Sequence, residues 1–257
     1  MLTRMSVLLG LVVCVCAWTG PVAGQTWDHV HLTVSDTEAA AEWYGEHFGG
    51  KVAKSGEFDA VWFGTNLVKF RGGSAEVLGS DGSTVEHIAF SVEDVKAKAD
   101  ALEEAGVEVS GVNRRKPDTR YATDPWGTKI ELLKDEDLMG FHHVLLKSTL
   151  ASDTVDWYVT IFGGEPENFK EAVNLKAIRY GDMYLFVKRA VRPAASTEGR
   201  SVDHLGWRVK DFDATIKKLK GLDVKFLMEP MEHGDRMIAF IEGPDGVKIE
   251  IVEGVGE

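Results

Sequence analysis

The first predicted strand of this chain contains the stretch Asp28-His29-Val30-His31-Leu32-Thr33-Val34, and a stretch of the same kind returns three more times. Each has apolar residues at alternating positions, which is typical of a β-strand with one buried face. A polar residue and a helical stretch follow each time, and a glycine ends that helical stretch. The recurring histidines of these openings are His29, His87, His143 and His204.

The repeating unit is predicted to be βαβββ, because strand-like runs follow each helix. The pattern predicts helices over residues 36–48, 94–105, 152–162 and 211–219. Two similar halves appear at a longer period, residues 25–135 and 138–257, and each is expected to hold two units. Residues 134–138 are the hinge candidate between the halves.

Residues 1–24 have the order of regions found in an export signal. A short basic segment precedes the apolar run Val7–Trp18, and small residues precede position 24. The apolar run is too short to cross about 30 Å of hydrocarbon, which favours a cleaved signal over a membrane anchor. Cleavage would remove both cysteines, Cys14 and Cys16, and we expect an exported protein, periplasmic or secreted.

The overall composition describes a folded, acidic protein. Hydrophobic residues make up 44% and charged residues 27%, and 41 acidic against 29 basic residues give a net charge of -12. Such a surface repels phosphate backbones and anionic membranes. We therefore expect a small-molecule partner, with neither nucleic acid nor membrane as partner of the mature chain.

The repeated histidines and two glutamates are the candidate ligands. Strand alternation places His29 and His31 on the face opposite Val30 and Leu32. A single histidine at a strand start is usually structural, but its recurrence in four equivalent places favours metal binding. The last predicted strands of the second and fourth units, residues 128–133 and 247–252, each follow a Pro-x-Gly turn and carry a glutamate on the face away from the helix. A carboxylate there needs a cation or an ion pair, for which the lysine two residues earlier is the alternative partner.

These repeats resemble the vicinal oxygen chelate superfamily, which includes glyoxalases, bleomycin-resistance proteins and extradiol ring-cleaving dioxygenases. The resemblance implies an α+β fold in which pairs of βαβββ units form half-barrels around a divalent metal ion, giving two modules in this chain. The implied ligands are the first-strand histidines and the last-strand glutamate of each module. Carried onto this sequence, they are His29, His87 and Glu131 in one half and His143, His204 and Glu250 in the other.

The pairing of the units is open from the sequence. The short hinge favours pairing within each half. Pairing of units one with four and two with three would instead give His29, His204 and Glu250 at one site and His143, His87 and Glu131 at the other. With pairing within halves, the N-terminal site is expected to be the active one, because it has His31 and Tyr121 where the other has Leu145 and Phe240.

The resemblance implies a metal-dependent enzyme acting on a small oxygenated molecule, with Fe(II), Mn(II), Zn(II) or Ni(II) at one or two sites. Glyoxalases carry a further Glu or Gln near the position of Lys69, so an extradiol-dioxygenase-like activity is preferred over a glyoxalase-like lyase or isomerase. Tyr121 matches the substrate-contacting tyrosine of dioxygenases, and His31 is the candidate acid–base residue. The alternative from another class is a metal-free binding protein. A monomer or a homodimer is expected.

Overall fold

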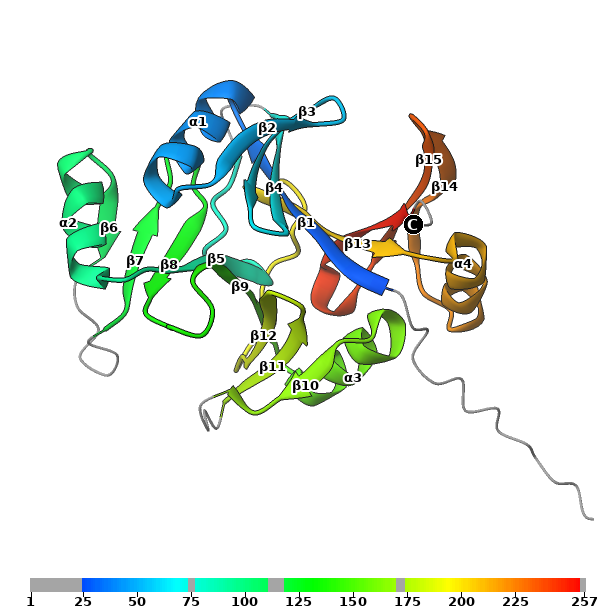
Figure 1. Cartoon of the computed structure of the whole chain (residues 1–257). Helices are drawn as coiled ribbons and strands as arrows, with labels where there is room; N and C mark the ends of the chain where they lie inside the picture. The colour runs from blue at the N-terminus through cyan, green and yellow to red at the C-terminus, as the bar shows by residue number, and fades with distance from the viewer. Residues whose placement is uncertain (1–24, 74–76, 111–117, 170–173, 255–257) are drawn as a thin grey trace, which may run out of the picture.

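The structure is a computed structural model that describes residues 25–73, 77–110, 118–169 and 174–254. In this part of the chain, two eight-stranded sheets lie back to back and four α-helices lie at their flanks (Figure 1). The predicted signal at residues 1–24 lies outside the described residues. No helix in the described ranges is long and apolar enough to cross a membrane.

Four βαβββ units follow one another along the chain. The first consists of β1 (Gln25–Val34), α1 (Thr37–Phe48), β2 (Lys51–Ser55), β3 (Phe58–Phe63) and β4 (Asn66–Gly72). The second consists of β5 (Val85–Ser91), α2 (Val95–Glu104), β6 (Glu108–Ser110), β7 (Arg120–Thr123) and β8 (Lys129–Leu133). The third consists of β9 (Gly140–Ser148), α3 (Ala151–Phe162), β10 (Glu165–Glu167), β11 (Leu175–Tyr180) and β12 (Met183–Arg189). The fourth consists of β13 (Val202–Val209), α4 (Phe212–Gly221), β14 (Phe226–His233), β15 (Arg236–Glu242) and β16 (Lys248–Glu253).

The predicted helices are confirmed, and their starts have the expected chemistry. Asp36, Asp94 and Asp211 each accept a hydrogen bond from the backbone N–H three residues later, which satisfies a donor that the first helical turn leaves free. Helix α3 begins after Leu150, and no side chain among the described residues caps it. Gly49 ends α1 at a φ of 75°, a conformation that suits glycine.

The pairing of the units differs from the one that the sequence favoured. Strand β1 pairs antiparallel with β13, and β5 pairs antiparallel with β9. The sheet orders are therefore β14-β15-β16-β13-β1-β4-β3-β2 and β10-β11-β12-β9-β5-β8-β7-β6. Pairing within each half is wrong: unit one shares a sheet with unit four, and unit two shares a sheet with unit three.

Connection lengths explain this pairing. The short segment 134–138 leads from β8 into β9, which enters the same sheet on the far side of β5. The longer connections, from β4 to β5 and from β12 to β13, cross between the two sheets. They run side by side, with Leu78 bridging Arg200 and Ser83 bridging Ala195 in parallel orientation. The hinge that the sequence placed between modules thus lies within one of them.

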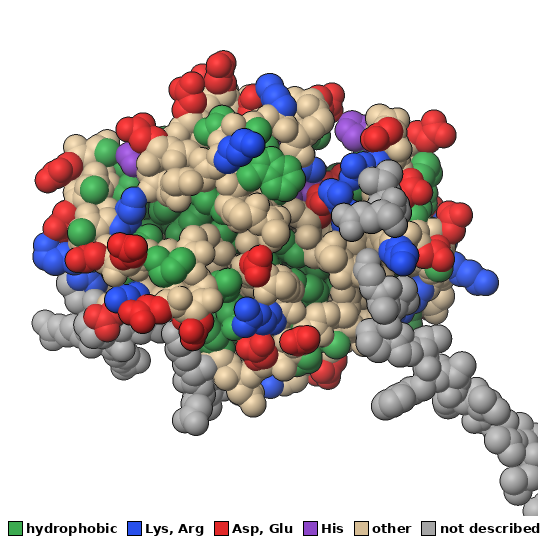
Figure 2. All heavy atoms as spheres, in the orientation of Figure 1, with side chains coloured by type: hydrophobic (Ala, Val, Ile, Leu, Met, Phe, Trp, Pro, Cys, Tyr) green, Lys and Arg blue, Asp and Glu red, His purple; other side chains and the backbone are tan. Residues whose placement is uncertain are grey.

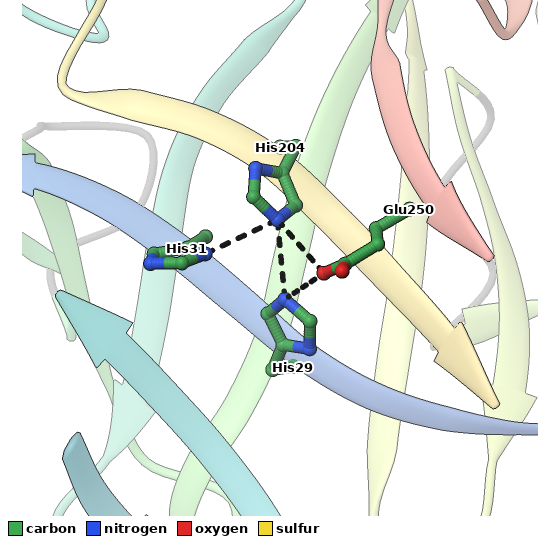
Figure 3. A group of neighbouring side chains, drawn as sticks. All are labelled: His29, His31, His204 and Glu250. Atoms are coloured by element: carbon green, nitrogen blue, oxygen red, sulfur yellow. Dashed lines mark hydrogen bonds and ion pairs between the residues drawn. The ribbon is translucent and has the colours of Figure 1, made fainter. Parts of the chain in front are cut away.

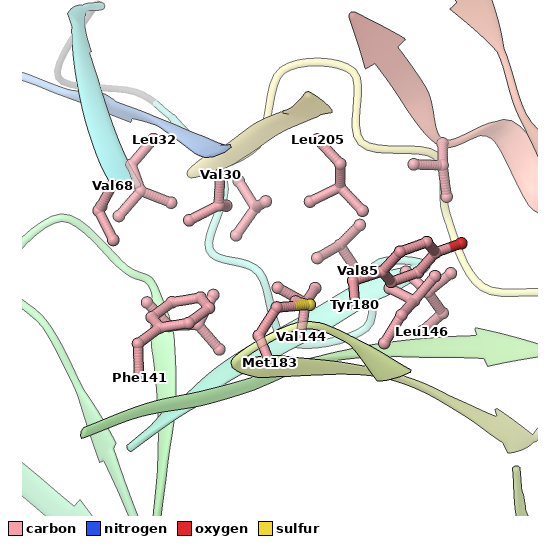
Figure 4. Packing of buried hydrophobic residues seen from close by; sticks show 14 of the residues in the cluster. Val30, Leu32, Val68, Val85, Phe141, Val144, Leu146, Tyr180, Met183 and Leu205 are labelled. Carbon is pink, nitrogen blue, oxygen red and sulfur yellow. The ribbon is translucent and has the colours of Figure 1, made fainter. Parts of the chain in front are cut away.

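The main hydrophobic core lies between the two sheets. Val30, Leu32 and Leu205 of one sheet face Val85 and Val144 of the other, and all five are buried (Figure 4). The helices extend this core across the unit boundaries, because the rings of Phe48 and Phe90, and those of Phe162 and Trp207, stack on one another. Side chains at the alternate positions of the central strands therefore point to the outer face of each sheet.

The surface matches the acidic composition. On the face drawn in Figure 2, Asp and Glu side chains are interspersed with Lys and Arg. The outer face of each sheet, by contrast, holds a buried group of histidine and carboxylate side chains.

Candidate metal centres

The first group, called the Glu250 site, consists of His29, His31, His204 and Glu250 (Figure 3). The Nε2 atoms of His29 and His204 lie 3.2 Å apart, and Oε2 of Glu250 lies 3.1 Å from the first and 3.2 Å from the second. Nδ1 of His31 lies 3.2 Å from Nε2 of His204. All four residues are buried.

Strand register brings these side chains together. His29 on β1, Gly206 on β13 and Glu250 on β16 are direct neighbours across three strands. A Cβ atom at Gly206 would lie 2.3 Å from Cε1 of His29, so the glycine makes room for the imidazole. His31 lies opposite His204 in the next row.

Two carboxylates fix the ring orientation of the histidines. Nδ1 of His29 is 2.7 Å from Oδ2 of Asp28, and Nδ1 of His204 is 2.6 Å from Oδ1 of Asp203. Arg208 donates to Asp28 through Nε at 2.9 Å. Each imidazole therefore donates its Nδ1–H outward and directs the lone pair of Nε2 inward.

This arrangement fits a divalent cation. Without one, two nitrogen lone pairs and an ionised carboxylate oxygen converge, which is unfavourable in a buried site. Donor atoms about 2.1 Å from a first-row metal ion lie about 3.0–3.4 Å from their neighbours, and the observed separations of 3.1 and 3.2 Å fall in that range. The residues present therefore suit a metal such as Zn(II), Mn(II), Fe(II) or Ni(II).

The second group, called the Glu131 site, consists of His87 on β5, Glu131 on β8 and His143 on β9. The two Nε2 atoms lie 3.2 Å apart, and Oε2 of Glu131 lies 2.8 Å from His87 and 3.3 Å from His143. Ala89 stands between His143 and Glu131, where the other sheet has Gly206. The hydroxyl of Tyr121 on β7 donates to Oε1 of Glu131 at 3.2 Å.

At the Glu131 site, the Nδ1 atoms of the two histidines have no direct, short hydrogen bond to a carboxylate among the described residues. Nδ1 of His143 faces Nδ1 of His142 at 2.8 Å, and Nε2 of His142 faces Oδ2 of Asp135 at 3.3 Å. Asp135 thus acts on the ligand through an intervening imidazole. Nδ1 of His87 lies 3.5 Å from Glu86, beyond a good hydrogen bond, while Lys147 holds Glu86 at 2.6 Å.

The electrostatics favour charged carboxylates at both sites and neutral imidazoles at His143 and His31, whereas His87 tends toward its protonated form. Burial alone would raise the pKa of Glu131 and Glu250, but the histidines bonded to each hold it well below its usual range. Burial lowers the pKa of His143 to about 3 and that of His31 well below its ordinary value. Burial by itself would lower the pKa of His87, but the bonded carboxylate of Glu131 and the nearby charge of Glu86 outweigh this and leave it raised.

All six predicted ligands fall in these two groups, in the arrangement that was the alternative from the sequence. The favoured set of His29, His87 and Glu131 is not assembled, because His29 lies in the other sheet. For the same reason His31 and Tyr121 belong to different sites. Phe240 lies opposite Glu250, as Tyr121 lies opposite Glu131, which confirms their equivalence.

The sequence reasoning missed the outer partners, although the repeats contain a signal for them. A carboxylate or a histidine directly precedes each recurring histidine: Asp28, Glu86, His142 and Asp203. Read together, these residues predict a support for each ligand. Asp135 and Gly206 gave no comparable signal.

Solved structures share this architecture. Glyoxalase I from Zea mays aligns with a TM-score of 0.68 and 19% identity, over 89% of this chain and 92% of that one. A "putative dioxygenase" from Bacillus subtilis aligns with a TM-score of 0.65 and 16% identity, over 90% of this chain and 85% of that one. At these identities the likeness concerns the fold alone.

Two sequence comparisons complete the picture. A "Probable lactoylglutathione lyase" of Synechocystis is 39% identical over 57 residues, a match that spans 21% of this chain and 44% of that protein. A model of the Glyoxalase/Bleomycin resistance protein/Dioxygenase superfamily matches residues 26–132 and again 140–251, and each match falls within one of the two similar halves of the sequence. This protein therefore belongs to the Glyoxalase/Bleomycin resistance protein/Dioxygenase superfamily.

Proposed function

We propose that the protein is a divalent-metal enzyme whose reaction takes place at the Glu131 site, on a small molecule with two adjacent oxygen atoms. His87, His143 and Glu131 would hold the ion. The ion would supply a Lewis acid with open positions for both substrate oxygens. The observation that carries the proposal is this three-ligand set lying between Tyr121 and an apolar wall.

The apolar wall is a cluster separate from the main core. It consists of Leu138, Leu145, Ala177, Tyr184 and Phe186, with Phe169 and Leu175 packed against it. The ring of Phe186 lies 4.3 Å from that of His143, so the wall begins at a ligand. Apolar walls with a few placed polar groups are typical of small-molecule sites, and this one suits an aromatic ring.

Tyr121 supplies the polar side of the site. Burial and the neighbouring Glu131 raise the pKa of its phenol, so the hydroxyl stays protonated at neutral pH and donates a hydrogen bond. Tyr121 also lines a pocket of about 240 Å³ together with Thr123 and Lys129. We propose that substrate approaches through this pocket and that Tyr121 orients one substrate oxygen.

Ring cleavage of the extradiol type is the preferred reaction, because the wall accepts a flat ring and the three-ligand set leaves room for dioxygen beside the substrate. A glyoxalase-type isomerisation is the second candidate, and the Synechocystis relative favours it. A metal-free binding protein is the candidate from another class. The buried lone pairs argue against it, because they need a cation.

The test uses purified protein repleted with Fe(II), Mn(II), Zn(II) or Ni(II) in turn. Each form is given a panel of catechols with oxygen uptake recorded, and then methylglyoxal with a thiol under argon. Ring cleavage predicts oxygen uptake equal to catechol consumed, whereas isomerisation predicts turnover without oxygen. Protein that retains no metal after repletion would support the binding function instead.

Variants locate the reaction. Glu131→Gln is expected to abolish turnover, because it replaces a charged ligand by a neutral one. Tyr121→Phe should reduce turnover while the metal stays bound. If Glu250→Gln abolished turnover and Glu131→Gln did not, the reaction would belong to the Glu250 site.

We also propose that the protein is exported. The tripartite composition of residues 1–24 supports this. Mass spectrometry of protein from the producing cell should find a chain that starts at Gln25. A chain that starts at Met1 in the membrane fraction would contradict the proposal.

A further inference from the structure

We infer that His31 is a fourth metal ligand of the Glu250 site, so that the chain holds two unequal metal centres. The Glu250 site would have four protein donors and the Glu131 site three. The inference concerns metal binding only and does not depend on which reaction the protein catalyses. It also replaces the acid–base role that the sequence suggested for His31.

The position of His31 carries the inference. It follows His29 by two residues on β1, so both side chains point to the same face of the sheet. Its Nδ1 lies 3.2 Å from Nε2 of His204, which is also the separation between the His29 and His204 nitrogens (Figure 3). The ligand atoms of His29, His31, His204 and Glu250 all lie within 4.8 Å of one another, so His31 belongs to the same set of donors.

The hydrogen bonding of His31 gives a second reason. Its Nε2 is buried and has no partner among the described residues, so its one polar contact is to a ligand nitrogen. His204 gives its Nδ1–H to Asp203, and its Nε2 lone pair is then directed at the ion. Nδ1 of His31 cannot use that lone pair once an ion is bound. The partner left for it is the ion itself.

Packing holds the ring in this orientation. Phe58 contacts the His31 ring edge to face at 4.8 Å, and the His204 ring lies 4.6 Å away on another side. Lys69, directly across the strand pair, has its ammonium group 3.8 Å from Asp28. Little reorganisation is needed for His31 to bind, because the side chain is already placed.

The other sheet supplies the contrast. Leu145 occupies the place of His31 and lies opposite His87, as His31 lies opposite His204. Phe186 lies next to Leu145 where Lys69 lies next to His31. The Glu131 site therefore has no donor at this position. Sites with all-protein ligands tend to hold a structural ion, whereas open sites bind substrate.

The test is a titration of the metal-free full-length protein with Co²⁺, followed by its visible absorption. Two binding steps are expected, the tighter one at the Glu250 site. A Glu131→Ala background removes a ligand from the other site, so that the remaining signal reports the Glu250 site alone. In that background, His31→Leu should weaken Co²⁺ binding by about tenfold or more and change the absorption spectrum, since a nitrogen donor is lost.

Two further variants make the result decisive. His31→Asn keeps an oxygen donor near the position of Nδ1. Its Co²⁺ affinity should lie between that of the parent and that of His31→Leu. Leu145→Ala truncates the equivalent position of the other sheet and should leave Co²⁺ binding at the Glu250 site unchanged. Circular dichroism and chemical unfolding of the metal-free variants check that each is folded. Equal affinity and an equal spectrum in the parent and a folded His31→Leu variant would overturn the inference.

Discussion

The two candidate metal sites have the same scaffold but different surroundings. In one sheet, the row of residues that ends at the ligand His204 runs Lys69, His31, His204, and in the other the row that ends at the ligand His87 runs Phe186, Leu145, His87. The Glu250 site is thus polar and has carboxylates bonded directly to two histidines, whereas the Glu131 site has an apolar wall and a tyrosine. The comparison teaches that strand register alone fixes the positions of two histidines and one glutamate at each site. The residues at neighbouring positions decide the number of further donors and the polarity of each site.

The largest expected effect concerns the outer partners. Asp28→Ala should weaken metal binding at the Glu250 site by about 10–100-fold, because His29 loses the carboxylate that fixes its ring. His142→Phe should weaken the Glu131 site less, since Asp135 acts there through an imidazole. Metal content after dialysis against graded chelator concentrations measures the affinity of both variants. Equal losses of affinity in Asp28→Ala and His142→Phe would contradict the expected difference between the two sites.

A smaller effect is expected at the position between the ligands. Gly206→Ala should lower the Co²⁺ affinity of the Glu250 site by about tenfold, because the new Cβ would lie 2.3 Å from the His29 ring. Ala89→Gly, at the equivalent position of the other sheet, removes a Cβ instead and serves as the matched control. Its Glu131 site should keep its affinity. If Gly206→Ala left the Co²⁺ affinity of the Glu250 site unchanged, the His29 ring could shift without weakening metal binding.

Two equivalent buried tyrosines, Tyr44 on α1 and Tyr158 on α3, allow a comparison of their contributions to stability. The hydroxyl of Tyr44 on α1 donates to buried Asp124 at 2.7 Å, whereas the hydroxyl of Tyr158 on α3 has no partner among the described residues. Tyr44→Phe should therefore lower the free energy of unfolding by about 1–3 kcal/mol, and Tyr158→Phe should change it little. Urea denaturation of the two variants measures the difference. A larger loss in Tyr158→Phe would contradict the contacts seen here.

The smallest effect is the pH dependence of that loss. Burial raises the pKa of Asp124 to about 6, although the Tyr44 hydroxyl opposes the rise. The hydrogen bond stabilises the charged form, so its contribution is complete only well above pH 6 and fades as Asp124 takes up a proton near and below pH 6. The penalty of Tyr44→Phe should accordingly shrink by about 1 kcal/mol between pH 7 and pH 5. Urea denaturation of both proteins at pH 7 and at pH 5 measures this change. A penalty that is the same at the two pH values would mean that Asp124 takes up its proton outside this pH range.

Much of the site was predictable from the repeated stretches. Alternation along β1 identified the histidine face, and the Pro-x-Gly turns located Glu131 and Glu250 on their strands. The pairing of units was not predictable, because either arrangement satisfies the same alternation and buries the same apolar faces. The short connection at residues 134–138 suggested a hinge between modules, whereas in the structure it joins units two and three within one sheet. Contacts such as that of Asp135 with His142 depend on that pairing and carry no local pattern of their own.

The unequal ligand sets can be observed directly by anomalous diffraction from a crystal of the cobalt-loaded protein. We predict an ion in each sheet. At the Glu250 site, Nδ1 of His31 should lie about 2.1 Å from the ion together with His29, His204 and Glu250. At the Glu131 site the protein should supply only His87, His143 and Glu131. An ion at the Glu250 site with the His31 ring turned away from it would contradict the distinction between the two centres.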